Sequence, residues 1–222
     1  MIFVDRVDAG RQLAKRLSGL PGDVRVLGLP RGGVPVALEV AKAIDAPLDV
    51  IVVRKLGVPW QPELAMGAVG EDGVRVTNDE VVRQTKVGEA DLIAAGERER
   101  LEVERRARQL RGSRERVSLE RCTAVIVDDG IATGATARAA CEVARAHGAS
   151  RIVLAVPVAP ADSIRQLQEV TDDVVCLQTP DRFFAVGRWY SDFRPTTDAD
   201  VIACLAEAAA VSARGDVGGR EV

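Results

Sequence analysis

The sequence predicts an α/β fold in which a parallel sheet of about five strands carries helices on both faces. Two observations lead to this expectation. Apolar runs of strand length, rich in β-branched residues, recur along the 222-residue chain, and segments with helical patterning separate them. Most of these runs keep several consecutive apolar residues and do not alternate strictly with polar ones, which is typical of strands buried on both faces. Ligands bind such sheets at the carboxyl ends of the strands.

Each element is expected from its local pattern. The composition of buried strands is found in residues 23–30, 48–55, 122–129, 151–158 and 173–178. Helical patterning is found in residues 9–17, 31–44, 134–146, 161–170 and 198–213. Asp8 precedes the first of these helices, and its carboxylate is predicted to cap that helix.

Residues 57–120 interrupt the alternation of strands and helices. They contain "GAVGEDGVRVTND", which looks like a small hairpin, and "EADLIAAGERERLEVERRARQLRG", a long and highly charged helical stretch. Two interpretations remain open: an exposed helix with a narrow apolar stripe, or an arm that folds over a site. We expect a single domain over residues 1–215, with 57–120 as an inserted flexible arm and 216–222 as a disordered tail.

Composition excludes several classes of function. The net charge is −3 and no block of one sign occurs, so no nucleic-acid or membrane partner is indicated. No apolar leader and no membrane-length apolar run is found, which favours a cytoplasmic location. The four cysteines are far apart and are expected in the core. The single histidine, His147, is expected at a helix C-terminus. It leaves little support for Ser-His-Asp or Cys-His catalysis or for multi-histidine metal sites, and no residue is predicted as a metal ligand.

The stretch "VIVDDGIATGAT", residues 125–136, sets two adjacent acids at a strand end before a loop of small residues that enters a helix. Free N–H groups and the helix dipole form an anion site there, and small side chains let a phosphate approach. No lysine follows the last glycine, so the loop is not a Walker A motif. Asp128 and Asp129 suit sugar hydroxyls or a bound cation, and a ribose 5′-phosphate would fit both parts. The alternative is that the two acids only cap the turn.

The same stretch resembles the signature of the type I phosphoribosyltransferases, in which two acids precede a small-residue loop with TGxT. The segments "VLGLPRGGVPVA", "VVRKLGVP", "AVPVAP" and "WYSDF" resemble a subgroup of that family whose acceptor is unassigned. The resemblance covers roughly residues 1–210. It implies a small C-terminal hood after the last strand, here residues 179–196.

The resemblance also implies a role for each loop. Asp128 and Asp129 would be the catalytic residues and would hold the ribose hydroxyls of phosphoribosyl pyrophosphate (PRPP). The 5′-phosphate would lie on Ala132, Thr133, Gly134, Ala135 and Thr136. Pyrophosphate would lie on Arg31, Gly32 and Gly33 of "PRGG" and on Arg54 and Lys55, which we expect to end the second strand. A plain strand-to-helix turn and a solvated strand end remain as alternatives for these two segments.

The order of the strands can be argued from the ligand. One PRPP molecule must touch both "PRGG" and "ATGAT", so the strands that precede these loops should be neighbours. This gives an order of 2-1-3-4-5, with the site at the switch point between strands 1 and 3.

Aromatic side chains make up only 3% of the chain, yet several gather where the family builds a hood over the base. A flat ring could stack on them. The candidates for acceptor binding are Phe183, Phe184, Trp189 and Tyr190. A small hydrophobic cluster or a subunit contact is the alternative, and Trp60 near the arm is a weaker candidate.

The implied reaction transfers ribose 5-phosphate from PRPP to a nitrogenous acceptor and releases pyrophosphate. Mg²⁺ would be the cofactor, bound mainly through PRPP oxygens. The partners would be PRPP and an unknown acceptor, and a homodimer is left open. An alternative is a regulatory protein that senses PRPP or a nucleotide and has vestigial catalysis. A kinase or a dehydrogenase is disfavoured, because the chain lacks a Walker lysine and a GxGxxG motif.

Ala132 bears on the choice of acceptor. Type I members that act on 6-oxopurines typically carry Asp at this place, where the carboxylate exchanges a proton with the purine N7. Members that act on adenine or orotate commonly have Ala there. A methyl group cannot exchange a proton, so the resemblance implies negligible activity with hypoxanthine or guanine.

Overall fold

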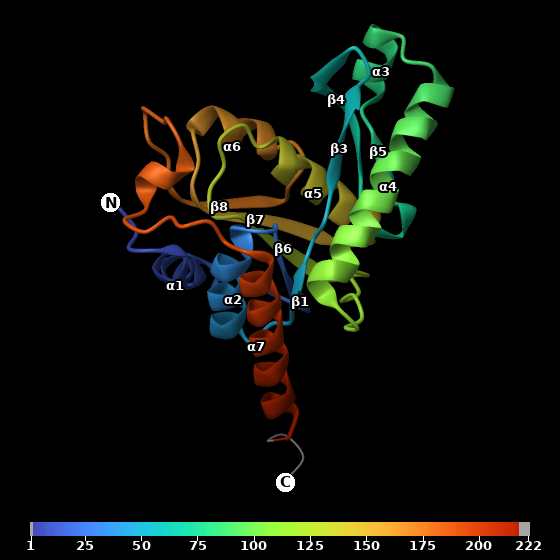
Figure 1. The fold of residues 1–222 in the computed structure, drawn as a ribbon. Coiled ribbons are helices and arrows are strands. Elements are labelled where there is room, and N and C mark those ends of the chain that lie inside the picture. The colour runs from blue at the N-terminus through green and yellow to red at the C-terminus, as the bar shows by residue number, and fades with distance from the viewer. Residues whose placement is uncertain (1, 218–222) are drawn as a thin grey trace.

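The structure is a computed structural model that describes residues 2–217. Within these residues the chain forms a five-stranded parallel sheet and a three-stranded antiparallel sheet. The parallel sheet has the order β2-β1-β6-β7-β8, which confirms the predicted fold class and the predicted order 2-1-3-4-5 (Figure 1). Its strands are β1 (Val24–Gly28), β2 (Leu48–Val50), β6 (Thr123–Val127), β7 (Arg151–Val158) and β8 (Asp173–Gln178).

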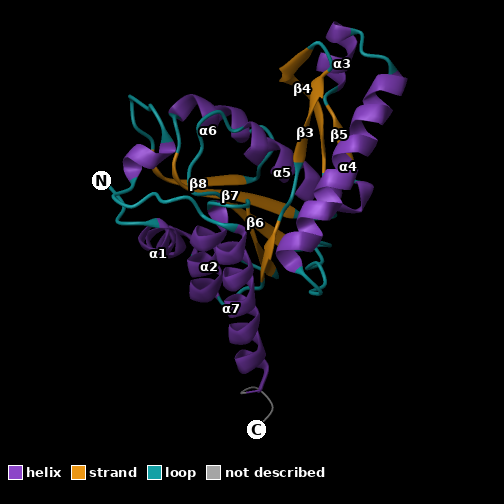
Figure 2. Cartoon of the chain, viewed as in Figure 1, coloured by secondary structure: helices purple, strands orange, loops and turns teal. Residues whose placement is uncertain are grey.

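Helices cover both faces of the parallel sheet (Figure 2). On one face lie α1 (Arg6–Leu17) and α2 (Gly33–Ile44), with α7 (Asp198–Val217) packed against α2. On the other face lie α5 (Ala135–Ala146) and α6 (Ala161–Leu167).

Side chains alternate between these two faces along each strand. In β6, Val125 and Val127 join the hydrophobic cluster of α1 and α2, whereas Ile126 joins the cluster of α5 and α6. Burial on both sides explains the continuous apolar runs of the central strands β6 and β7. Cys122 and Cys141 are buried as expected, Cys176 and Cys204 are half-buried, and His147 caps the C-terminus of α5.

The first helix begins earlier than predicted, because its N-cap is Asp5 and not Asp8. The carboxylate of Asp5 accepts a hydrogen bond from the backbone N–H of Asp8 at 2.8 Å. The carboxylate of Asp8 accepts in return from the N–H of Val4 at 3.0 Å. The two acids thus cap the helix reciprocally. The prediction was wrong because both members of such a pair are acidic, and the sequence pattern does not tell which one lies outside the helix.

The second strand is shorter than predicted. β2 ends at Val50, where its pairing with Gly28 of β1 also ends. The chain then leaves the parallel sheet and enters β3 (Arg54–Val58) of the antiparallel sheet. Arg54 and Lys55 therefore begin a strand of the inserted segment, and the prediction that they end the second strand was wrong. Residues 50–53 are all apolar, so the sequence does not show that the edge strand β2 loses its partner after Val50.

The inserted segment contains the predicted hairpin and the predicted long helix. β4 (Gln61–Val69) pairs with β3 and with β5 (Arg75–Thr77), and the 3₁₀ turn η1 (Glu71–Gly73) connects β4 to β5. Two helices follow, α3 (Asp79–Thr85) and α4 (Glu89–Arg111). The elements of the inserted arm, predicted for residues 57–120, run from the start of β3 to the end of α4, and from here on the arm means residues 54–111. α4 contacts β3 and β4, and α5 contacts all three arm strands, so the base of the arm is packed. Its flexibility stays a prediction.

A buried ion cluster fixes the end of α4 to the parallel sheet. The guanidinium of Arg111 donates to the carboxylate of Asp49 in β2 at 2.9 Å. It also donates to both carboxylate oxygens of Glu71 in η1, at 2.5 and 3.0 Å. All three side chains are about nine-tenths buried or more. Breaking such a cluster by removing one partner typically costs about 3–5 kcal/mol, so this end of the arm is firmly held.

Residues 179–196, the predicted hood, lie beside the N-terminal segment and include the 3₁₀ turn η2 (Val186–Trp189). The backbone of Phe3 donates to Trp189 and accepts from Ser191, each at 2.8 Å. α7 continues to Val217, so residues 216 and 217 belong to a helix, and the rest of the predicted tail lies outside the described residues. No helix in residues 2–217 is long and apolar enough to cross a membrane.

Candidate functional site

The two predicted ligand loops leave the sheet side by side. Gly28 and Val127, the last residues of β1 and β6, are paired, and the N–H of Leu29 donates to the carbonyl of Val127 at 2.9 Å. A side chain at Gly32 would collide with the carboxylate of Asp129. The "PRGG" turn therefore touches the acid pair, and glycine is required there because of this close approach.

The loop before α5 has the form expected of a phosphate site. Gly134 is the N-cap of α5 and has a φ of +78°, a left-handed conformation that favours glycine. Ala132, Thr133, Ala135 and Thr136 are exposed. The hydroxyl of Ser163 in α6 donates to the carbonyl of Ala132 at 2.8 Å and so fixes the loop from behind. The first N–H groups of α5 thus face solvent from a loop that a phosphate can approach.

Asp128 and Asp129 are half-buried at the end of β6. The carboxylate of Asp128 accepts a hydrogen bond from the backbone N–H of Asp129 at 2.9 Å. Burial raises the pKa of Asp128 well above its ordinary value, and the charge of Asp129 adds to the increase. Burial also raises the pKa of Asp129, although a nearby arginine acts against it. A pair of acids with raised pKa values at the edge of a sheet is typical of a functional site.

That arginine is Arg6, which the sequence analysis did not select. Its Nε and Nη2 atoms each lie 2.8 Å from Oδ2 of Asp129. Its Nη1 atom donates to the carbonyl of Arg194 at 2.8 Å, and its guanidinium stacks 4.0 Å from the centre of the Phe193 ring. The only signal in the sequence was its place in the first turn of α1, which does not reveal the direction of the side chain.

A cleft of about 500 Å³ lies between the parallel sheet and the arm. Pro30 of the "PRGG" turn and Thr136 in the first turn of α5 border it, as do Arg54 and Lys55 at the start of β3. The structure thus brings together parts of the predicted pyrophosphate and phosphate groups around one cavity. The basic pair reaches this cavity from the arm and not from a strand of the parallel sheet.

The arm adds a further cation to this cleft, Arg106 of α4, which the sequence analysis also did not select. A signal was available for it. Val103 and Leu110 belong to the buried stripe of α4, and Arg106 lies at i+3 and i−4 from them, on the same side of the helix. Arg31 is exposed, and its Nη1 atom lies 3.7 Å from a carboxylate oxygen of Asp198 at the start of α7.

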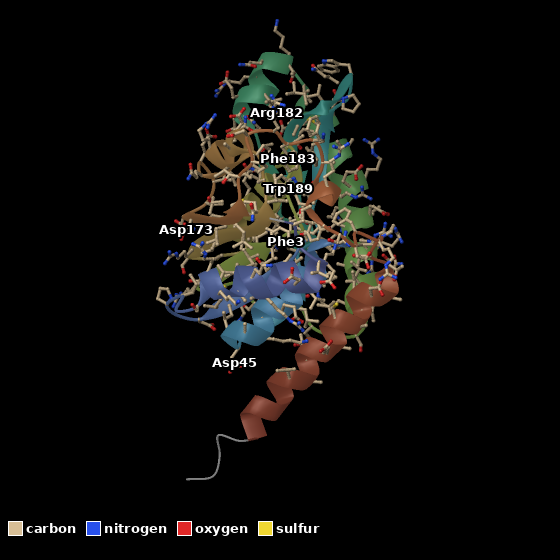
Figure 3. All side chains as sticks on the ribbon, turned by 90° about the vertical axis from the view of Figure 1, so that its left-hand side faces the viewer. Phe3, Asp45, Asp173, Arg182, Phe183 and Trp189 are labelled. Atoms are coloured by element: carbon tan, nitrogen blue, oxygen red, sulfur yellow. The ribbon has the colours of Figure 1, made fainter. Side chains whose placement is uncertain are left out.

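The predicted acceptor residues are spread over the hood. Phe183 and Trp189 are half-buried, and Figure 3 shows them on the same side of the molecule as Phe3. The ring of Phe184 is highly exposed, at 74%, and Arg188 lies 5.2 Å above it. Trp60 is also exposed, at the turn between β3 and β4.

Tyr190 does not offer a ring face to a ligand. It is 6% exposed, and its ring packs against Phe3 and Phe193. Its hydroxyl donates to the backbone carbonyl of Asp129. Burial, together with the charge of Asp129, raises the pKa of Tyr190, so the hydroxyl stays protonated. We therefore correct its assignment from acceptor stacking to positioning of the Asp129 backbone.

A second cavity, of about 430 Å³, lies on the hood side of Arg6. Asp5 and Arg6 border it at the start of α1, and Asp192 and Thr196 border it from the C-terminal part of the hood. Arg6 therefore stands between this cavity and the carboxylate of Asp129.

Comparisons with known proteins identify the family of the chain. The model of the phosphoribosyl transferase domain family matches residues 5–194. Two curated Mycobacterium tuberculosis proteins, from strains CDC 1551 / Oshkosh and ATCC 25618 / H37Rv, are each 58% identical over 223 residues. They are named "Putative phosphoribosyl transferase MT0597" and "Putative phosphoribosyl transferase Rv0571c". The match covers 97% of this chain and 50% of each relative, so the chain spans about half the length of these relatives.

A solved structure has a similar fold. The crystal structure of the Thermus thermophilus protein TT1426 is similar to this one, with a sequence identity of 43% and a TM-score of 0.87. The match covers 93% of this chain and 99% of that chain. With the family model matched over most of the sequence, the chain belongs to the phosphoribosyl transferase domain family.

Proposed function

We propose that the protein binds PRPP with Mg²⁺ and transfers ribose 5-phosphate to a nitrogenous acceptor, releasing pyrophosphate. One observation carries the proposal: the "PRGG" turn touches the carboxylate of Asp129, and the small-residue loop before α5 follows the same two acids. Sites for a pyrophosphate, a ribose and a 5′-phosphate would thus lie within the span of one PRPP molecule.

Each group of residues would have a separate task. The N–H groups before α5 would bind the 5′-phosphate, because the helix N-terminus attracts anions. Asp128 and Asp129 would accept hydrogen bonds from the ribose hydroxyls. The backbone of Gly32 and Gly33, with Arg31, Arg54 and Lys55, would bind the pyrophosphate group, since guanidinium and N–H donors match phosphate oxygens.

The donor set of the site suits Mg²⁺, which prefers oxygen ligands. Within residues 2–217 no group of three or more acidic, histidine or cysteine side chains is close enough to hold a metal. Asp128 and Asp129 could supply one or two carboxylate oxygens, so the ion would be held mainly by the substrate. When bound, Mg²⁺ would neutralise charge on the departing pyrophosphate.

In the reaction, the bond between ribose C1 and the pyrophosphate oxygen breaks, and pyrophosphate leaves with the electron pair. A bond then forms between C1 and the acceptor nitrogen, which gives up its proton. The protein would act by positioning the reactants, by stabilising charge and by excluding water. The arm forms one wall of the cleft, and its closure would keep water from the ribose. The acceptor could enter from the cavity beside the hood.

A screen for pyrophosphate release tests the proposal. The protein is incubated with PRPP, Mg²⁺ and a panel of nucleobases and amines, and pyrophosphate is measured with and without each acceptor. The variant Asp128→Asn serves as the control. Acceptor-dependent release by the wild-type protein alone supports the proposal, whereas the absence of PRPP binding by calorimetry contradicts it.

One observation favours the alternative, a PRPP-sensing or nucleotide-sensing protein with vestigial catalysis. Arg6 already occupies Oδ2 of Asp129, an oxygen that a ribose hydroxyl would use. Tight binding of PRPP without pyrophosphate release for any acceptor would support the regulatory alternative. A cytoplasmic location and a homodimer remain our expectations under either function.

A further inference from the structure

Three arginines at or beside the cleft each have a carboxylate partner: Arg54 and Arg106 border the cleft, and Arg31 follows Pro30, which also borders it. Arg31 follows β1 and Arg106 lies on α4, and both reach Asp198, the first residue of α7. Arg54 of β3 lies 3.3 Å from Glu102 of α4. The arginines that border the proposed pyrophosphate site are thus paired with acids of the protein itself.

Asp198 is the centre of this arrangement. Its two carboxylate oxygens accept from Nη1 and Nη2 of Arg106 at 2.5 and 2.6 Å, a bidentate pair. The side-chain amide of Gln109 donates to it at 2.9 Å, and Arg31 lies 3.7 Å away. The hydrogen bonds of Arg106, followed by its charge and that of Arg31, lower the pKa of Asp198. One carboxylate therefore occupies the point where two guanidinium groups meet.

A ligand can replace Asp198 in its ion pair with Arg106. The side chains of Arg106 and Asp198 are 23% and 27% exposed, and partly exposed ion pairs contribute little to stability. A guanidinium fork fits a phosphate group as well as it fits a carboxylate. Pyrophosphate carries several negative charges where Asp198 carries one, so it would compete well for both arginines.

We infer that Asp198 is a built-in competitor of pyrophosphate, which holds Arg31 and Arg106 in the ligand-free protein and yields both to the pyrophosphate group of PRPP. Arg106 is then a pyrophosphate ligand supplied by the arm. The inference rests on the proposed function, because it assigns the ligand of the same cleft. It also explains how the arm would respond to substrate. The ion pair between Arg106 and Asp198 joins α4 to α7, and pyrophosphate would replace it.

A purely structural role for the pair makes a different prediction. If Asp198 and Arg106 only join α7 to α4, then removing either partner has the same consequence, a loosened arm and weaker binding. If Asp198 competes with the ligand, the two changes act in opposite directions. Loss of the acid strengthens pyrophosphate binding, and loss of the arginine weakens it.

The test measures the affinity for inorganic pyrophosphate and for PRPP, each with Mg²⁺, by calorimetry on the full chain. Asp198→Asn keeps the size of the side chain and removes its charge, and we expect binding to tighten by about threefold. Arg106→Gln removes a charge-assisted donor, and we expect binding to weaken by about tenfold. Affinity for AMP, used as a probe of the 5′-phosphate loop, should change in neither variant.

Two variants serve as matched controls. Asp200→Asn alters another acid in the first turn of α7, whose carboxylate accepts from Thr197 and not from an arginine. Arg108→Gln removes a charge from the same arm helix at an exposed position. Both should bind pyrophosphate as the wild-type protein does, because neither residue borders the cleft in our assignment.

The outcomes separate the inference from the proposed function. Tighter pyrophosphate binding in Asp198→Asn together with weaker binding in Arg106→Gln supports the inference that Asp198 competes with the ligand. Weaker binding in both variants, or unchanged binding in both while the wild-type protein binds PRPP, overturns the competitor and leaves the proposed function standing. A wild-type protein that binds neither PRPP nor pyrophosphate overturns both.

Discussion

Arg6 and Asp129, 123 positions apart in the chain, form an ion pair of 2.8 Å at the edge of the parallel sheet. The pair joins the start of α1 to the acid loop after β6. Arg6 acts to lower the pKa of Asp129, against the burial that raises it. Arg6 thus favours the charged form of a carboxylate that would otherwise tend to take up a proton.

The pair predicts a shift in the pH dependence of binding. In Arg6→Gln the cation is lost, so the pKa of Asp129 rises further and its carboxylate becomes protonated at a higher pH. The loss of PRPP affinity on acidification should therefore begin at a higher pH than in the wild-type protein. Calorimetric titrations with PRPP and Mg²⁺ across the acidic and neutral range measure this. Arg11→Gln, which alters an exposed ion pair on the same helix, is the control. An identical pH profile in Arg6→Gln and the wild type would contradict the assignment.

Asp128→Asn should abolish function and yet stabilise the ligand-free protein at neutral pH. The pKa of Asp128 is raised in the folded state, so its ionisation above that pKa disfavours folding, and the penalty disappears as the pH falls below its unfolded pKa. Asparagine avoids the penalty and keeps an oxygen that can accept from the N–H of Asp129. PRPP affinity should fall by about a hundredfold, since charge-assisted hydrogen bonds to the ribose are lost. The double variant with Asp129→Asn should lose PRPP binding altogether, but it should not gain stability in the same way, because Asp129 is the ion-pair partner of Arg6.

Thermal unfolding at neutral and acidic pH checks the stability part. Asp172→Asn is a control of opposite sign: the pKa of Asp172 is lowered because the N–H of Ile152 and the side chain of Arg145 outweigh the effect of burial. Its replacement should destabilise the protein at neutral pH. A lower melting temperature for Asp128→Asn at neutral pH would contradict the argument.

We propose that the loop before α5 binds the 5′-phosphate and that the "PRGG" turn binds pyrophosphate. Glycine and arginine variants test this division. Gly134→Ala puts a side chain on a left-handed residue beside the phosphate site, and a new Cβ would lie 3.1 Å from Leu167. It should weaken PRPP and AMP alike. Arg31→Ala should weaken PRPP and pyrophosphate, by about tenfold, and should spare AMP.

Backbone strain alone must be separated from the loss of a phosphate site. Gly148→Ala provides the comparison, because Gly148 also has a left-handed φ, of +92°, after the far end of α5. It should lower stability without changing AMP affinity. Equal loss of AMP affinity in Gly134→Ala and Arg31→Ala would mean that the two loops do not divide the ligand as we propose.

Ala132 predicts negligible activity with hypoxanthine and guanine, because a methyl group cannot exchange a proton with the purine N7. Incubation with PRPP, Mg²⁺ and hypoxanthine, followed by chromatography for inosine monophosphate, measures this directly. Adenine is the comparison, because the resemblance implies that members acting on adenine commonly have Ala at this position. Efficient formation of inosine monophosphate would refute the argument.

Hydrogen exchange should show that the arm is less protected at its tip than at its base. The base is held by Arg111 and by contacts with α5, whereas α3 has no buried residue. Amides of α3 and of the β3–β4 turn should exchange faster than those of β6, and PRPP with Mg²⁺ should slow them. Strong protection along the whole arm without ligand would mean that it is a fixed structural element.

The sequence predicted the strands of the parallel sheet better than it predicted the residues around the site. β7 and β8 have the predicted bounds, because polar residues or a nearby proline mark the ends of both apolar runs. The end of β2 depends on where β1 stops, which the residues after Val50 do not encode. Arg6 was missed because it is one charge among many on a helix, and its role arises from contacts distant in sequence. Arg106 lies beside the buried stripe of α4, which indicates that its side chain faces the fold but does not indicate which acid it meets.

The hydrophobic cluster of the arm includes residues of the parallel-sheet domain. Val34 of α2 and Val201 and Leu205 of α7 pack in the same cluster as Leu56, Met66 and Val103 of the arm. Replacing the arm with a short linker would expose these three domain residues to water. We therefore expect the arm and the sheet domain to unfold in a single transition, with the arm behaving as part of the domain core and not as a removable module.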